Sequence, residues 1–309
     1  MQNSKREHFE AASQLPQRQF IEMEHCTDIL NELDYVHGRA VAGEPCGVVI
    51  SGPTGSGKSS ILKYYKTTWD DKLPAGEPSP IVYIRTPSKP SEILMLESEL
   101  KALGDPAPRK GTSNSKRERK EALIKNLHCK VFIYDDFQHV IEYRGTVVAR
   151  QLLDELKNIS EEYGVSLVFT GITTVEIGGL INEQINSRFS SLRRLKVMTV
   201  ENDDEFNYFQ EFLEDFSMTK GITNFDMASE NSVHRFAYAC GGDLRILNHI
   251  TNKALHYFKL SKDKKIALEH FASAFDDVIS EEWDDIKVRK VNPFDTDKWT
   301  TVKRRIGIK

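Results

Sequence analysis

A glycine-rich segment that ends in lysine and serine, at residues 52–59, has the composition of a phosphate-binding loop. It reads Gly-Pro-Thr-Gly-Ser-Gly-Lys-Ser, lies after an apolar run and precedes a helical pattern. Glycine lets the backbone wrap a phosphate closely, Lys58 adds a positive charge at the β and γ phosphates, and Ser59 offers a hydroxyl to magnesium. We therefore predict binding of a nucleoside triphosphate. The expected contacts are Gly52, Pro53, Thr54, Gly55, Ser56, Gly57, Lys58, Ser59 and Ser60.

Two adjacent carboxylates, Asp135 and Asp136, end a second apolar run at residues 131–134. A hard cation prefers oxygen ligands, so Asp135 is predicted to hold magnesium directly or through water, together with Ser59. Asp136 is predicted to orient the attacking water. The third apolar run, at residues 167–169, ends in Thr170, whose hydroxyl is expected to contact the γ-phosphate or that water.

Two arginines have positions that suit contacts to phosphate. Arg188 is a candidate arginine finger, which would reach the nucleotide of a neighbouring subunit. Arg245 follows a Gly-Gly-Asp-Leu turn and would lie in the first turn of a helix that Asp243 caps. From there it is expected to swing onto the γ-phosphate when the domains close. His139, beside the carboxylates, is a further residue of interest.

Short apolar strands alternate with amphipathic helices from residue 45 to 200, which predicts an α/β domain with a parallel sheet covered by helices on both faces. We expect strands at Val48 to Ser51, Ile81 to Arg85, Lys130 to Tyr134, Ser166 to Thr170 and Leu195 to Val200. The intervening helices are expected near 59–69, 91–103, 115–127, 147–163 and 179–188.

Helical patterns flank this domain on both sides. Residues 1–44 are expected to form a separate helical segment, with its clearer helix at 20–41. Residues 201–280 are expected to form an α-helical lid domain, with Asn202 capping the first helix and further helices at 227–240, 243–258 and 266–279. Residues 281–309 lack periodicity and are expected to be an extended tail.

The composition excludes several classes of protein. The chain has 309 residues, 39% of them hydrophobic and 28% charged, with a net charge of −4. We see no apolar stretch that could span a membrane and no secretion signal, so we expect a cytoplasmic protein without a membrane partner. The four cysteines are widely separated, which argues against structural zinc and a disulfide framework.

In their order along the chain, these motifs resemble AAA+ ATPases, and most closely the TniB/TnsC family of bacterial transposition ATPases. The resemblance covers about Phe20 to Ile279. Besides the P-loop it rests on Leu103-Gly104-Asp105-Pro106, Asp135-Asp136-Phe137-Gln138-His139, Leu156-Lys157-Asn158, Phe169-Thr170-Gly171, Ser187-Arg188-Phe189 and Gly241-Gly242-Asp243-Leu244-Arg245.

The resemblance implies a function as well as a fold. It implies ATP and Mg²⁺ as cofactors, and a ring or helical filament of identical subunits around duplex DNA, bound without sequence specificity. It also implies a transposase partner and a target-selection protein of the TniQ type. Two ways of choosing the target stay open, a sequence-specific DNA binder and an RNA-guided complex. AAA+ proteins usually carry Glu where this chain has Asp136, so hydrolysis is expected to be slow.

A basic segment at residues 109–120 holds six basic residues and one acidic residue, separated by small polar side chains. Such a composition suits contacts to DNA phosphates, because lysine and arginine neutralise charge while hydroxyls and amides bond to backbone oxygens. The resemblance places this segment at the DNA-facing insertion of the family. The predicted contacts are Lys110, Thr112, Lys116 and Arg119.

Three other functions remain open from the sequence: an AAA+ replication initiator or helicase loader, a P-loop kinase of a small metabolite, and a signalling scaffold held closed by its nucleotide. A C-terminal helix-turn-helix domain would favour the first. The kinase would leave Arg188, Arg245 and the basic segment unexplained. For the tail, we predict docking onto the transposase or another transposon protein, with Phe294 and Trp299 entering pockets.

Overall fold

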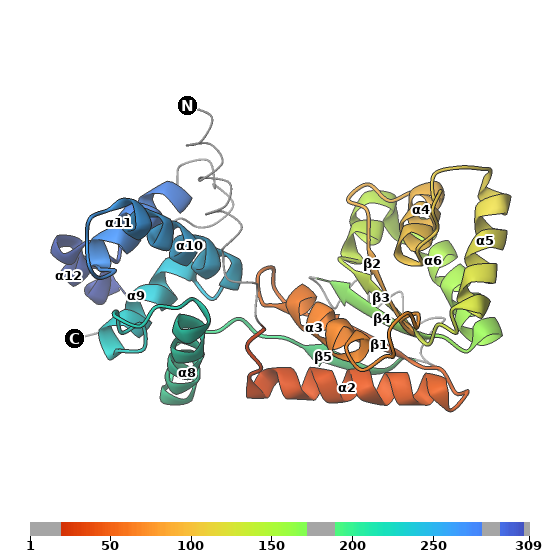
Figure 1. The fold of residues 1–309 in the computed structure, drawn as a ribbon, viewed down its shortest axis with the longest axis horizontal. Helices are drawn as coiled ribbons and strands as arrows, with labels where there is room; N and C mark the ends of the chain where they lie inside the picture. The colour runs from red at the N-terminus through yellow and green to blue at the C-terminus, as the bar shows by residue number, and fades with distance from the viewer. Residues whose placement is uncertain (1–19, 172–188, 280–290, 306–309) are drawn as a thin grey trace. The chain divides into compact units, whose positions relative to one another are not determined.

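The computed structural model describes residues 20–171, 189–279 and 291–305. The chain divides into two compact units, Glu22–Lys196 and the segment from Val197 onward (Figure 1). None of the helices within these described ranges is long and apolar enough to cross a membrane.

A parallel sheet of five strands forms the centre of the first unit. Its strands are β1 (Gly47–Ser51), β2 (Ile81–Arg85), β3 (Val131–Asp135), β4 (Ser166–Gly171) and β5 (Phe189–Arg194), in the order β2-β3-β4-β1-β5. The central strands β1, β3 and β4 are buried along their whole length, as strands with covered faces must be. Since all strands run the same way, the carboxyl ends of β1, β3 and β4 meet at one edge.

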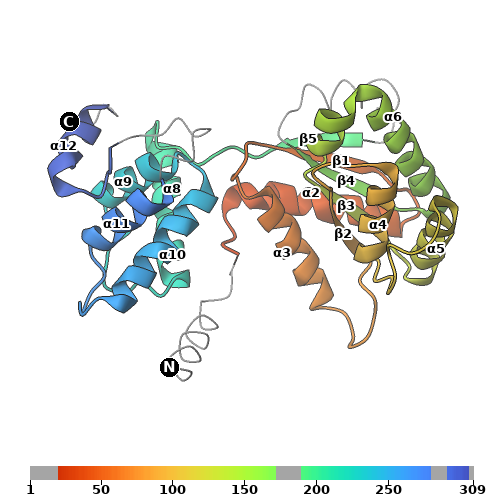
Figure 2. The same ribbon diagram turned by 90° about the horizontal axis from the view of Figure 1, so that it is seen from above.

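Helices cover both faces of this sheet (Figure 2). Residues of α4 (Glu92–Ala102), α5 (Ser113–Asn126) and α6 (Gln138–Tyr163) share one buried cluster with Phe132, Tyr134 and Phe169 of the strands. The other face packs on α2 (Glu24–Val41), where the Ser166 hydroxyl donates to the carbonyl oxygen of Val36 at 2.9 Å, and on α3 (Lys58–Asp70).

Four of the five strands lie where the sequence predicts them, and one prediction is wrong. The fifth strand is β5, at residues 189–194, and residues 195–200 are not a strand. β5 pairs with β1 at the edge of the sheet, and two of its polar side chains share one acidic partner: Glu32 of α2 accepts from Arg193 at 3.1 Å and also from Ser191. The apolar residues at 195–200 therefore predicted a strand in the wrong place, because the true edge strand is polar.

Two further boundaries differ from those expected. Helix α2 packs on the sheet, so residues 24–41 belong to the α/β unit and not to a separate N-terminal segment. Helix α6 begins at Gln138, directly after the paired carboxylates, and not near residue 147. The prediction of a helix at 179–188 lies outside the described residues.

The second unit is helical. It contains α8 (Asp203–Thr219), α9 (Glu230–Cys240), α10 (Leu244–Leu260), α11 (Leu268–Val278) and α12 (Thr296–Arg305). Asn202 caps α8 as predicted, because its side chain accepts from the N–H of Glu205 at 3.0 Å. The buried face of α8 consists of Phe209, Phe212, Leu213 and Phe216.

The segment from residue 291 to 305 is not an extended tail, and this corrects our prediction. Phe294 is 1% exposed and packs against Phe236 and Phe271, with ring centroids 5.0 and 5.6 Å away. Trp299 lies under the guanidinium of Arg235, 4.2 Å from the ring centroid, and Arg235 also donates to the carbonyl oxygen of Pro293. The two aromatic residues complete the core of their own unit, so they are not available to enter pockets of a partner.

Replacing Phe294 by alanine is expected to destabilise the helical unit by about 3–5 kcal/mol, because it leaves a cavity among three phenylalanine rings. Urea unfolding followed by circular dichroism measures this loss. Thr300→Ala, on the exposed side of α12, is the control and should stay within about 0.5 kcal/mol of wild type. An equally stable Phe294→Ala protein would show that the segment does not pack as described.

Candidate nucleotide site

The P-loop joins β1 to α3 at the carboxyl edge of the sheet. Gly55 and Gly57 have φ angles of 79° and 96°, a left-handed conformation that glycine adopts without strain. A Cβ on Gly52 would lie 2.4 Å from the carbonyl oxygen of Leu195, so no other residue fits there. The first turn of α3 carries no acidic side chain, which leaves its N-terminal N–H groups and helix dipole suited to an anion.

Lys58 holds its charge inside this loop. Its side chain is 8% exposed, and its Nζ donates to the carbonyl oxygens of Gly52 at 2.7 Å and Pro53 at 2.8 Å. The Ser56 hydroxyl donates to the same Pro53 oxygen at 2.8 Å. The amine therefore lies inside the loop, and its contact with the β and γ phosphates stays a prediction.

Asp135 is a buried carboxylate with three hydrogen-bond donors. Its side chain is 2% exposed. Oδ1 accepts from the Thr170 hydroxyl at 2.6 Å and from the N–H of Asp136 at 3.2 Å, and Oδ2 accepts from the hydroxyl of Tyr83. These donors fix the carboxylate in one orientation at the end of β3.

The position of Thr170 changes the role expected for it. Its hydroxyl proton goes to Asp135, its oxygen accepts from the N–H of Asp136 at 3.1 Å, and the residue is fully buried. A threonine hydroxyl has a single proton to donate, so none is left for a γ-phosphate or a water. In this structure Thr170 orients the carboxylate of Asp135 and the backbone of Asp136.

Asp136 lies in a tight turn and contacts Gln138, a residue for which the sequence predicted no role. Its φ of 57° is left-handed, which is uncommon for a residue other than glycine. Gln138 donates from Nε2 to Asp136 Oδ1 at 3.4 Å. Gln138 is 4% exposed, and its Oε1 has no hydrogen-bond partner among the described residues. The sequence motif contains this glutamine, but only the fold reveals that it faces Asp136.

Tyr83 is a second residue that sequence reasoning missed. It lies in β2, whose neighbour in the sheet is β3. Burial and the negative charge of Asp135 raise the pKa of Tyr83 far above its usual value, while hydrogen bonding from Ser59 opposes this shift. The phenol therefore stays protonated and donates to Asp135 at neutral pH.

The residues fit a magnesium ion that is bound mostly by phosphate and water. Ser59 offers a hydroxyl and Asp135 a carboxylate, and such oxygen ligands suit this cation. Mg²⁺ usually keeps several waters and binds through one or two protein ligands. Tyr83, in contact with Asp135 and close to Ser59, links the two predicted ligands.

Of the two predicted arginines, only Arg245 lies among the described residues. Arg188 lies outside the described residues. Arg245 lies in the first turn of α10, where Asp243 accepts its N–H at 2.8 Å, which matches the predicted cap. The Arg245 side chain is 57% exposed, and its guanidinium pairs with the same Asp243, Nη2 to Oδ2 at 2.7 Å.

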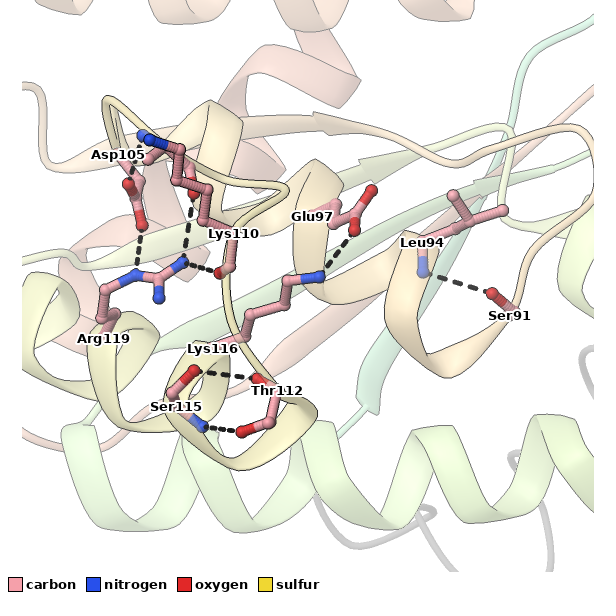
Figure 3. A network of polar contacts seen from close by, with 10 residues as sticks. Ser91, Leu94, Glu97, Asp105, Lys110, Thr112, Ser115, Lys116 and Arg119 are labelled. Atoms are coloured by element: carbon pink, nitrogen blue, oxygen red, sulfur yellow. Dashed lines mark hydrogen bonds and ion pairs between the residues drawn. The ribbon is translucent and has the colours of Figure 1, made fainter.

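Two predicted DNA contacts are held by internal ion pairs (Figure 3). Lys116 is 4% exposed, and its Nζ lies 2.6 Å from Oε1 of Glu97 in α4. Arg119 pairs with Asp105 at 2.8 Å and donates to the carbonyl oxygens of Ala107 at 3.3 Å and Lys110 at 2.9 Å. Both side chains stabilise the fold of the segment, so the structure does not support them as phosphate contacts.

In the rest of the basic segment, some side chains are also held by contacts within the protein and others are exposed. Lys120 is 2% exposed and pairs with Glu99 and Glu155, and Arg117 pairs with Glu92 at 2.9 Å. Thr112 caps α5, because its Oγ1 accepts from the N–H of Ser115 at 3.3 Å. The exposed cations are Arg109 and Lys110, in the loop before α5.

Comparison with solved structures identifies the fold. The Aeropyrum pernix ORC1 protein, solved in complex with DNA, matches at 17% identity with a TM-score of 0.66, over 84% of this chain and 66% of that chain. Cdc6p from Pyrobaculum aerophilum matches at 17% identity with a TM-score of 0.63, over 85% and 70%. Domain III of the Thermotoga maritima replication initiation protein DnaA matches at 16% identity with a TM-score of 0.54, over 84% and 95%. The fold is that of the AAA+ proteins.

The family is established from the sequence rather than from these distant structures. No curated protein sequence matches the chain. The sequence model of a family described as bacterial TniB protein matches residues 12–198, a range that contains the P-loop and both carboxylates. This protein belongs to the TniB family.

Proposed function

We propose that this protein is an ATP-dependent regulator of DNA transposition. It would assemble with ATP and Mg²⁺ on target DNA and link target selection, through a protein of the TniQ type, to the transposase. The observation that carries the proposal is a P-loop whose lysine lies inside the loop, together with a buried Asp135 that accepts three hydrogen bonds. Both lie within the region that matches the TniB family.

In this proposal ATP acts as an assembly switch. Lys58 contacts the β and γ phosphates, Ser59 and Asp135 hold magnesium, and Asp136 orients the attacking water. The carboxylate of Asp136 is one methylene shorter than that of a glutamate, which places it farther from the water and slows hydrolysis. Slow hydrolysis suits an assembly that must persist until the transposase arrives. Arg188 would complete the site of a neighbouring subunit in a ring or filament.

For DNA, we propose phosphate contacts by the loop that Arg119 supports. Its exposed cations, Arg109 and Lys110, protrude from a backbone whose carbonyls bond to Arg119. Thr112 ends the loop, with an exposed side chain that also caps α5. Contacts of this kind position a protein on DNA without reading its bases. The Aeropyrum pernix ORC1 protein, a structural neighbour, has been solved in complex with DNA.

Lys110→Ala is expected to weaken duplex binding equally for all sequences and to reduce the slope of log affinity against log salt by about 0.9, because one phosphate contact is lost. Fluorescence anisotropy with a labelled duplex at several salt concentrations measures the slope. Lys116→Ala removes the same charge nearby, yet should leave the slope unchanged, since its amine is paired with Glu97. The reverse result would reinstate Lys116 as a contact.

A replication initiator or helicase loader is the competing function, and the likeness to ORC1, Cdc6p and DnaA favours it. That likeness rests on identities of 16–17% and concerns the fold, whereas the TniB match covers the nucleotide-binding region. A metabolite kinase gains no support from either comparison.

Electron microscopy with a non-hydrolysable ATP analogue, with and without duplex DNA, tests the proposal. Rings or filaments that require both ligands are the expected result. A protein that stays monomeric under all conditions would contradict it. A pull-down then separates the two AAA+ functions: capture of a transposase supports the proposal, and capture of a replicative helicase supports the alternative.

A further inference from the structure

Tyr83 links the two elements that carry the proposed magnesium ligands. It lies in β2, and its phenol crosses to Asp135 at the end of the neighbouring strand β3. Its ring also faces α3, since the Nζ of Lys63 lies 5.5 Å from the ring centroid. Lys63 lies one helical turn after Ser59, so both residues are on the side of α3 nearest the ring.

The phenol completes the fixation of the Asp135 carboxylate. Thr170 holds Oδ1 at 2.6 Å, and the Tyr83 hydroxyl donates to Oδ2. With a donor on each oxygen, the carboxylate cannot rotate without breaking a hydrogen bond. Oδ1 also accepts from the N–H of Asp136, whereas Oδ2 accepts only from Tyr83 among the described donors, so the second lone pair of Oδ2 can still accept from a metal-bound water.

We propose that Tyr83 is a positioning residue for the magnesium ion that accompanies ATP. It acts through Asp135, which it holds in the orientation that the hydrated ion needs, and through its position beside Ser59. Partners of metal-binding carboxylates in other proteins commonly contribute 10–100-fold to metal affinity. The inference rests on the proposed binding of Mg²⁺ and ATP.

The test compares wild type with Tyr83→Phe, which keeps the ring and removes only the hydroxyl. Binding of a fluorescent ATP analogue is followed while Mg²⁺ is titrated, so the readout does not depend on hydrolysis. We expect the Mg²⁺ concentration at half-maximal binding to rise about 10–100-fold. Binding of the analogue in EDTA should be unchanged, because the P-loop is intact.

Tyr64→Phe is the matched control. Tyr64 lies in α3 and also donates to a carboxylate, Glu22 Oε2 at 2.8 Å, but Glu22 is not a proposed magnesium ligand. Its Mg²⁺ titration should match wild type. Thr170→Val, which removes the donor to the other oxygen of Asp135, should shift the titration in the same direction as Tyr83→Phe.

The possible failures are distinguishable. An unchanged midpoint for Tyr83→Phe would overturn the inference, and a lower midpoint would also overturn it by showing that the phenol competes with the metal. In either case the wild-type titration still shows Mg²⁺-dependent nucleotide binding. If wild type itself showed no such dependence, the proposed function would fail first.

Discussion

Lys58→Ala is expected to abolish ATP-dependent assembly. Lys58 is the fixed positive charge at the β and γ phosphates in the proposed site, and its Nζ is held inside the loop by hydrogen bonds to the carbonyl oxygens of Gly52 and Pro53. Without the amine, the binding of a triphosphate would lose its main charge partner. Nucleotide binding by calorimetry and assembly by size-exclusion chromatography measure the two steps.

Lys66→Ala is the control for this variant. Lys66 lies in the same helix, and its amine pairs with Asp70 one turn away, outside the loop. A half-buried pair one helical turn apart contributes little to the site, so Lys66→Ala should bind and assemble as wild type does. If Lys58→Ala retained both ATP affinity and assembly, the P-loop would not be the nucleotide site.

Local pattern was enough to predict the nucleotide loop and the central strands. The P-loop needs residue types at fixed spacing, and that spacing is visible in sequence. Strands buried on both faces read as continuous apolar runs, which is why β1, β3 and β4 are nearly where we expected them. The edge strand β2 is mostly apolar and buried as well, so it carries the same signal. β5 is an edge strand with polar side chains, so it lacks that signal.

The number of charges along the sequence led to a wrong prediction of DNA contacts in the basic segment, because the acidic partners of its side chains lie outside that segment. Within residues 109–120 only Glu118 is acidic. The carboxylates that pair with Lys116, Lys120 and Arg119 come from α4, from α6 and from Asp105. A run of charges predicts a solvated or DNA-binding surface only when no other element packs against it, and the packing is set by the fold.

The C-terminal segment shows the same limit for aromatic residues. Phe294 and Trp299 are spaced too irregularly to predict a helix face, so they indicated an extended binding segment. The structure buries both against α9 and α11. From the sequence of this segment, packing against another protein cannot be distinguished from packing against the rest of the same chain, because both bury the same apolar side chains.

Contacts between side chains on neighbouring strands could not be predicted from the sequence either. Tyr83 looks like an ordinary strand residue, and Thr170 looks like a polar residue free to contact the nucleotide. Pairing of β2 with β3 and of β3 with β4 brings both hydroxyls onto Asp135. Residue types and spacing were enough to nominate Asp135, while only the fold shows the hydroxyls that orient it.

Arg188→Ala is expected to lower the rate of ATP hydrolysis about a thousandfold while isolated subunits still bind ATP. An arginine finger stabilises charge that develops only in the transition state, so its loss affects turnover more than binding. Steady-state phosphate release measures the first quantity and calorimetry the second. Arg194→Ala, a few residues on at the exposed end of β5, is the control and should hydrolyse ATP at the wild-type rate.

Mixing the variants tests whether Arg188 acts on a neighbouring subunit. Arg188→Ala keeps an intact P-loop and Lys58→Ala keeps the finger, so a mixed assembly contains some interfaces where an intact P-loop faces an intact finger. Those interfaces should hydrolyse ATP, and activity should peak near equal amounts of the two proteins. If no ratio restores activity while mixed assemblies are seen by microscopy, Arg188 acts within its own subunit or not at all. Recovery would show that the assembly, and not the single chain, is the hydrolytic unit.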